Sequence, residues 1–147
     1  SESTDKFYIV GGDEWFPWRY PNKPRPYQPR GGFHFLDFTD IDNPKEEAVY
    51  TITEAGSHNH WIKGDTLYAA YYNGGLRIVD ISGELLGDLY RQGREIAVFQ
   101  TGHPEGHIKN TPNVWGAIPY KEYIFFSDMY SGLYCIKLVD KNEFSSP

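Results

Sequence analysis

Four histidines are spaced so that their side chains could bind a transition-metal ion. His58 and His60 are two residues apart, and His103 and His107 lie in a later segment near Glu105. Neutral imidazoles bind Zn or Cu well, so two to four converging rings, with or without a carboxylate, would make a metal site. The alternative is that the first pair packs and hydrogen-bonds at the start of a strand while the second pair is solvated.

An aromatic segment between residues 11 and 31 is the second candidate site. It contains Trp15, Trp18, Arg19 and Tyr20, followed by prolines at positions 21, 24, 26 and 29. Trp, Tyr and Arg dominate the energetics of protein interfaces and can also stack on a ligand. We therefore predict that these four residues bind a partner protein or a ligand. A stiff flap that covers an open flank of the fold and a plain solvated loop are the other interpretations.

The sequence lacks the motifs of the common enzyme classes. It has no Gly-x-Ser-x-Gly elbow, no phosphate-binding glycine loop, no zinc-protease helix motif and no nucleotide fingerprint. The formal net charge of -6 argues against nucleic-acid binding, which needs clustered Lys and Arg. No apolar stretch has the length of a membrane span. We assign no catalytic residue, and no cofactor other than the Cu or Zn considered above.

Three similar segments indicate an internal repeat. They are residues 32–37 (GFHFLD), 75–80 (GLRIVD) and 132–137 (GLYCIK), each opened by a glycine. Aromatic residues make up 17% of the chain, and its 15 Gly and 10 Pro suit strands and turns better than helices. A repeat built from strand patterns alone is typical of a β-propeller or a β-solenoid. Cys135, the single cysteine, alternates within the last segment and is expected to be a buried structural thiol.

Aligning the copies predicts an all-β fold of about ten strands in four-stranded antiparallel units, as in propeller blades. The first unit, 6–53, lacks its opening strand; the second, 58–101, is complete; the third, 113–139, lacks its closing strand. Gly64-Asp65 and Asn73-Gly74 have the residues of tight hairpin turns. The expected strands are 6–10, 33–38, 48–53, 58–63, 66–72, 76–81, 95–101, 113–119, 123–128 and 133–139.

Two and a half blades cannot close a ring, because propellers generally need at least four. Open sheet edges and faces favour aggregation unless something covers them. We therefore expect another chain, symmetry copies or a further region to supply the remaining blades. Ending after a third strand suggests the C-terminal two to three blades of a longer ring. A curved sheet that is stable alone is the alternative.

At the level of motifs, the chain resembles the LVIVD-repeat β-propeller family. Residues 75–81 (GLRIVDI), with the run YAAYYNG before them, carry the resemblance, and residues 32–37 and 132–136 look like weaker copies. The chain departs from the pattern at Lys137, which replaces the Asp that ends the strand, and in the insert after Gly11. The resemblance implies the propeller fold and a secreted, periplasmic or cell-surface protein without a defined chemistry.

In such a fold, the loops that join fourth to first strands and second to third strands emerge on one rim, where function tends to concentrate. Strand alternation is expected to point His58 and His60 to one side. Trp61 recurs as Trp115 in the next unit, so this pair is expected to pack between blades. Asp37 and Asp80 occupy equivalent positions and are expected to cap turns.

Two functions follow. The first is a non-catalytic propeller segment of an exported or surface-exposed binding or assembly protein, which contacts a protein partner through the rim loops and the insert 11–31. The second is a metal-dependent oxidoreductase or lyase with rim histidines as ligands, in analogy with propellers resembling selenium-binding proteins. We favour the first, because the histidine spacing is the only sign of chemistry.

Overall fold

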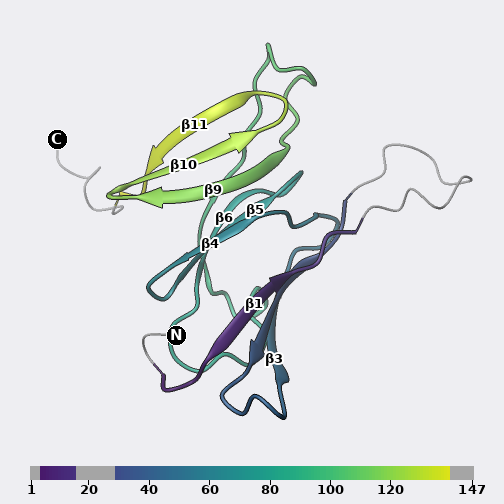
Figure 1. Cartoon of the computed structure of the whole chain (residues 1–147). Helices are drawn as coiled ribbons and strands as arrows, with labels where there is room; N and C mark the ends of the chain where they lie inside the picture. Colours follow the sequence, from purple (N-terminus) through teal and green to yellow (C-terminus); the bar gives the residue numbers. More distant parts are fainter. Residues whose placement is uncertain (1–3, 16–28, 140–147) are drawn as a thin grey trace, which may run out of the picture.

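The computed structural model describes residues 4–15 and 29–139, and these residues form three β-sheets that follow one another in chain order (Figure 1). All strand pairs are antiparallel except one short parallel pair. The first sheet has the order β1 (Tyr8–Gly12), β2 (Gly32–Asp37), β3 (Lys45–Thr51) and β7 (Gly87–Asp88). The second has the order β4 (His60–Lys63), β5 (Thr66–Tyr71), β6 (Gly75–Asp80) and β8 (Glu95–Phe99). The third has β9 (Val114–Tyr120), β10 (Tyr123–Asp128) and β11 (Gly132–Lys137).

All ten strands expected from the sequence are present, and their ends differ by a few residues from those expected. The additional strand, β7, lies in the connection between β6 and β8 and pairs in parallel with β3 of the first sheet. Its flanking Leu85 and Leu89 are buried in the same core as the first two sheets. Two residues between glycine-rich turns carry no recognisable strand pattern, so β7 depends on this tertiary contact.

The central strands of the second sheet, β5 and β6, are buried on both faces. On β5, Leu67, Ala69 and Tyr71 join the core shared with the first sheet, whereas Ala70 and the partly buried Tyr68 join the core shared with the third. Successive side chains of a strand point to opposite faces, so burial on both sides requires an almost continuous apolar run. Residues 67–72 (LYAAYY) and 76–79 (LRIV) meet this requirement.

The predicted turns at Gly64-Asp65 and Asn73-Gly74 both form, but at the second the positive φ falls on the following glycine and not on either predicted residue. Gly75, which follows the Asn73-Gly74 turn, has a φ of +80°, and a Cβ atom there would lie 2.5 Å from the carbonyl oxygen of Phe99. The Asp37 and Asp80 carboxylates each accept a bond of 2.8 Å from the backbone N–H two residues later, at Thr39 and Ser82. The predicted capping role of these two aspartates is therefore confirmed.

The prediction for Cys135 is wrong: this thiol is exposed on β11. Alternation along the strand sets Ile136 and Tyr134 against the second sheet and turns Cys135 to the opposite face of the third sheet. That face has no covering sheet among the described residues. None of these residues forms a helix long and apolar enough to cross a membrane.

A buried polar group ties the first sheet to the second. Arg77, only 9% exposed, donates from Nη1 to the Glu95 carboxylate (3.0 Å) and from Nε to the Gly74 carbonyl (2.7 Å). Across the interface, the Tyr50 hydroxyl donates to the same Glu95 oxygen (2.5 Å). Burial and this hydrogen bond together raise the pKa of Tyr50 far above its ordinary value, so the hydroxyl stays a donor.

Replacing Glu95 by Ala should destabilise the fold by about 3 kcal/mol, because it leaves the Arg77 guanidinium buried without its counter-charge. The matched control is Glu46→Ala on β3. Glu46 pairs with His34 at the equivalent position of the first sheet but is half exposed, so its loss should cost at most about 1 kcal/mol. Urea unfolding followed by circular dichroism measures both, and equal effects of the two substitutions would contradict the structural role of Glu95.

Candidate functional site

Connecting segments of all three sheets meet at one end of the strands, which we call the rim: residues 13–15 with 29–31, 52–59, 72–74, 100–113 and 129–131. Hydrogen bonds join them across the sheets. The Ser57 hydroxyl donates to the Asp13 carbonyl (2.5 Å), and the His107 N–H donates to the Tyr130 carbonyl (2.8 Å). The rim is therefore a connected surface.

Asp128 anchors the longest rim loop, residues 100–113. Its buried carboxylate accepts bonds from the Thr101 hydroxyl (2.5 Å), the Asn113 N–H (2.6 Å) and the Tyr130 N–H (2.8 Å). Burial alone would raise the pKa of Asp128, but these donors outweigh it and the pKa lies below its ordinary value. The carboxylate is thus an ionised structural anchor, which holds both ends of the loop to β10.

Glu14, His58, Tyr72 and Trp115 form a rim cluster between the second and third sheets. The His58 ring stacks on the Trp115 ring with centroids 4.9 Å apart and meets the Tyr72 ring edge-on at 5.1 Å. The Tyr72 hydroxyl donates to the Glu14 carboxylate (2.7 Å), whose other oxygen lies 3.9 Å from His58 Nε2. Burial and this carboxylate raise the pKa of Tyr72.

The rim cluster has a defined hydrogen-bond polarity. His58 Nδ1 lies 2.5 Å from the Trp115 carbonyl, which only accepts, so this nitrogen carries the proton. Nε2 of the same ring faces the Glu14 carboxylate at 3.9 Å. This carboxylate beside exposed aromatic surface suits a ligand or partner group that donates hydrogen bonds. Trp115 makes the contact between sheets that was predicted for it and Trp61, whereas Trp61 is 48% exposed on β4.

His58 and His60 do not point to one side, contrary to the expectation from strand alternation. His58 contacts Trp115 of the third sheet, whereas the His60 ring meets Phe33 of the first sheet edge-on at 4.9 Å. A β-bulge is the reason. The backbone N–H of His58 donates to the Ala70 carbonyl, while the N–H of Ala70 donates to the Asn59 carbonyl. His58 and Asn59 together therefore oppose the single residue Ala70, and the alternation of side chains shifts by one residue.

The two loop histidines are exposed and have local partners. His103 Nδ1 accepts a bond from the Glu105 N–H (3.1 Å), and the His107 ring lies beside Tyr130 at 6.2 Å. Within residues 4–15 and 29–139, no group of three or more His, Cys, Asp or Glu side chains could hold a metal ion. The geometry thus adds no support to a metal site at His58, His60, His103 and His107.

Trp15 begins the aromatic insert and is 46% exposed at the rim. Its backbone pairs with that of Arg30 in both directions, at 2.9 and 2.8 Å, which closes the base of the insert. Gly31 completes this base with a φ of +133°, where a Cβ atom would collide with the Asp13 carbonyl. The predicted contact residues Trp18, Arg19 and Tyr20 lie outside the described residues.

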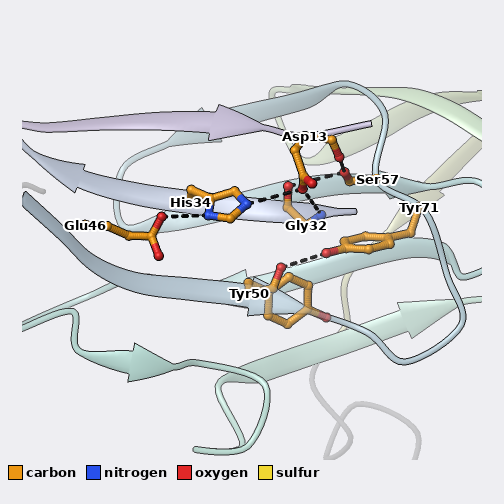
Figure 2. Close-up of polar contacts among 7 residues, drawn as sticks. All are labelled: Asp13, Gly32, His34, Glu46, Tyr50, Ser57 and Tyr71. Carbon is orange, nitrogen blue, oxygen red and sulfur yellow. Dashed lines mark hydrogen bonds and ion pairs between the residues drawn. The ribbon is translucent and has the colours of Figure 1, made fainter. Parts of the chain in front are cut away.

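Sequence reasoning missed a second polar group, on the first sheet beside the rim (Figure 2). His34 Nδ1 lies 2.9 Å from the Glu46 carboxylate, and Nε2 lies 3.3 Å from the Asp13 carboxylate, which also accepts the Gly32 N–H at 2.6 Å. An open cavity of about 460 Å³ adjoins this group and is also lined by Arg30. The repeat contained a signal for this group. His34 occupies the position that Arg77 has in the second unit, and Glu46 occupies the position of Glu95.

The pKa of His34 should be measurably higher than that of His60 in an NMR titration of the histidine rings. Burial would lower the pKa of His34, but the hydrogen bonds to Glu46 and Asp13 outweigh it and raise it. Burial dominates at His60 and lowers its pKa. Glu46→Gln should bring the His34 pKa down without moving that of His60. The opposite order of the two pKa values in the wild-type chain would contradict the geometry.

The raised pKa of His34 also has a consequence for stability. Protonation of a group whose pKa is higher in the folded state favours folding, so the contribution is complete below the unfolded pKa of about 6.5. This stabilisation is lost as the pH rises through the pKa of His34 in the folded state. Urea unfolding should therefore show a larger stability difference between wild type and His34→Gln in mildly acidic than in alkaline buffer. A stability difference between the two proteins that does not change with pH would contradict the raised pKa of His34.

The sequence matches no family model and no curated protein, and the structure matches no solved structure.

Proposed function

We propose that the chain is a non-catalytic binding and assembly segment, whose three sheets are consecutive blades of a β-propeller. Support comes from the repeated register. Gly75 pairs with Tyr71 and Gly132 with Asp128 at the same point of their hairpins, and each sheet packs face to face on the next in chain order. Among the described residues, the third sheet has three strands, the first sheet has no strand at the place that β4 takes in the second, and neither outer sheet has a covering sheet on its other face. The proposal includes further blades from another chain or from symmetry copies.

The rim is the proposed contact surface for a protein partner. It combines exposed aromatic residues, Trp15 and Trp115, with the polar groups of Glu14 and His58 on a scaffold held by backbone pairing. Rigid aromatic residues next to hydrogen-bonding groups are the composition of energetically important interface residues. The base of the insert 11–31, where Trp15 pairs with Arg30, is part of this surface. A protein of this kind fits the secreted, periplasmic or cell-surface location that the LVIVD resemblance implies.

Mapping of selected peptides tests the rim. A random peptide library is selected on the immobilised full chain, and each bound peptide is retested on variants. A rim binding surface predicts that most selected peptides lose at least about tenfold in affinity on Trp15→Ala and Trp115→Ala, because aromatic anchors carry most of the binding energy.

The control is Tyr120→Ala, an exposed aromatic residue at the opposite end of β9. Peptides that map to Tyr120 as often as to the two tryptophans would refute the rim as the preferred contact surface. Circular dichroism of each variant checks that the fold is retained.

A further inference from the structure

The three sheets share one pattern of faces, which defines an interface that is used twice within the chain. We call the face of a sheet that is turned toward the next sheet in chain order its leading face, and the opposite one its trailing face. The leading positions that directly follow the glycine of each repeat are Phe33, Leu76 and Leu133. Phe33 and Leu76 are fully buried against the following sheet, whereas Leu133 is 76% exposed.

Most of the rest of the leading face of the third sheet is apolar, with Ser127 and Lys137 as polar members, and no sheet among the described residues covers it. Phe125 and Cys135 occupy the positions of Tyr68 and Ile78 in the second sheet, where both pack on the third. Phe125 remains 37% exposed, and Cys135 is exposed. An open cavity of about 470 Å³ at the edge between the second and third sheets reaches this face, where Ile118, Phe125 and Leu133 line it, and Trp61 of β4 lines its other side. The third sheet therefore presents the same kind of surface that the second sheet buries.

The trailing face of the first sheet is the matching surface at the other end of the stack. Ile9, Gly11 and Leu36 occupy the positions of Leu67, Ala69 and Val79, which the first sheet covers completely in the second. Ile9 is 42% exposed, and a Cβ atom built on Gly11 would meet nothing within 4 Å. This surface is open where its counterparts are packed.

The two open surfaces are complementary in size. In the first interface, the small trailing residue Ala69 shares a core with the large leading residues Phe33 and Phe35. In the second interface the sizes are exchanged, and the small leading residue Ala70 shares a core with Phe126. The open surfaces resemble the first arrangement, because Gly11 is small at the position of Ala69 and Leu133 is large at the position of Phe33. Cys135 is smaller than Phe35, whose position it takes, and the neighbouring Phe125 is larger than its counterpart Val10.

The polar residues on the trailing face of the first sheet do not oppose its burial. His34 and Glu46 stand at the positions of Arg77 and Glu95, an ion pair that the chain already buries between its first two sheets. Each member of the His34 and Glu46 pair has its partner on the same face (Figure 2). Docking a sheet there would leave neither charge unpaired.

We propose that a second copy of this chain docks head to tail, with the leading face of its third sheet on the trailing face of the first sheet. This inference rests on the proposed function, because it names the partner that continues the stack of sheets. The contact joins two different surfaces, so every added copy presents a fresh leading face. Such a heterologous contact closes into a ring when the rotation per copy permits, and otherwise extends as a filament.

Sedimentation equilibrium of the full chain over a wide concentration range tests the proposal. The wild-type chain should associate, and Leu133→Glu and Ile9→Glu should each abolish association, because each places a carboxylate in one apolar surface. An equimolar mixture of the two variants should form a 1:1 heterodimer, since the Ile9→Glu chain keeps an intact leading face and the Leu133→Glu chain an intact trailing face.

The matched control is Ile41→Glu, a similarly exposed aliphatic residue in the turn between β2 and β3, and this variant should associate like the wild type. Alkylation of Cys135 gives a second readout. Its rate should fall as the wild-type concentration rises, and should stay high in the Leu133→Glu chain. Urea unfolding midpoints of the two face variants close to that of the wild type establish that both fold.

A monomeric wild-type chain at every concentration would overturn the proposal. So would association that survives both face variants, or loss of association in only one of them, which would indicate a symmetric contact through a single face. None of these results depends on the peptide mapping of the rim, so docking of a second copy and the proposed rim function can fail separately.

Discussion

Burial of the second sheet on both faces is the constraint on which the rest of the structure depends. Its strands β5 and β6 bury apolar side chains in both directions, and the first and third sheets each bury one face against it. The outer sheets are therefore apolar on their inner faces and have no covering sheet on the other, among the residues described. This asymmetry explains why similar strand sequences have such different exposure.

The Arg77 and Glu95 pair shows how a polar group is accommodated in this stack. Its charges are compensated within one sheet, and the neighbouring sheet adds only the Tyr50 hydroxyl. The same positions carry His34 and Glu46 in the first sheet, where solvent takes the place of a neighbour. Two of the three copies thus carry a pair of opposite charge at these positions, on a covered face in one sheet and on an open face in the other.

The rim is organised differently from the sheets, because its residues do not recur. Its hydrogen bonds run from loop to loop, and the bulge at His58 and Asn59 places one imidazole against each neighbouring sheet. The eleven described strands support this end by their pairing while its side chains vary, a division of roles that favours binding at the rim.

The sequence by itself determined the strands, their turns and their order, because alternation of side chains and the glycine positions are local properties. The positions of Gly75 and Gly132 and the caps at Asp37 and Asp80 could all be predicted in this way. Local pattern also states which residues share a face. It does not state whether that face is covered, since this depends on the neighbouring sheet.

Only the tertiary structure decided the exposure of Cys135, the separation of His58 from His60, the parallel strand β7 and the contacts of His34. Each depends on contacts outside its own strand. Cys135 lies on a face that no described sheet covers, and a one-residue bulge separates His58 from His60. β7 lies in a connection that reaches another sheet, and His34 contacts two carboxylates from different segments. The candidate site is less predictable than the fold for the same reason, because it is made of contacts between repeats, whereas the repeat itself is visible in one dimension.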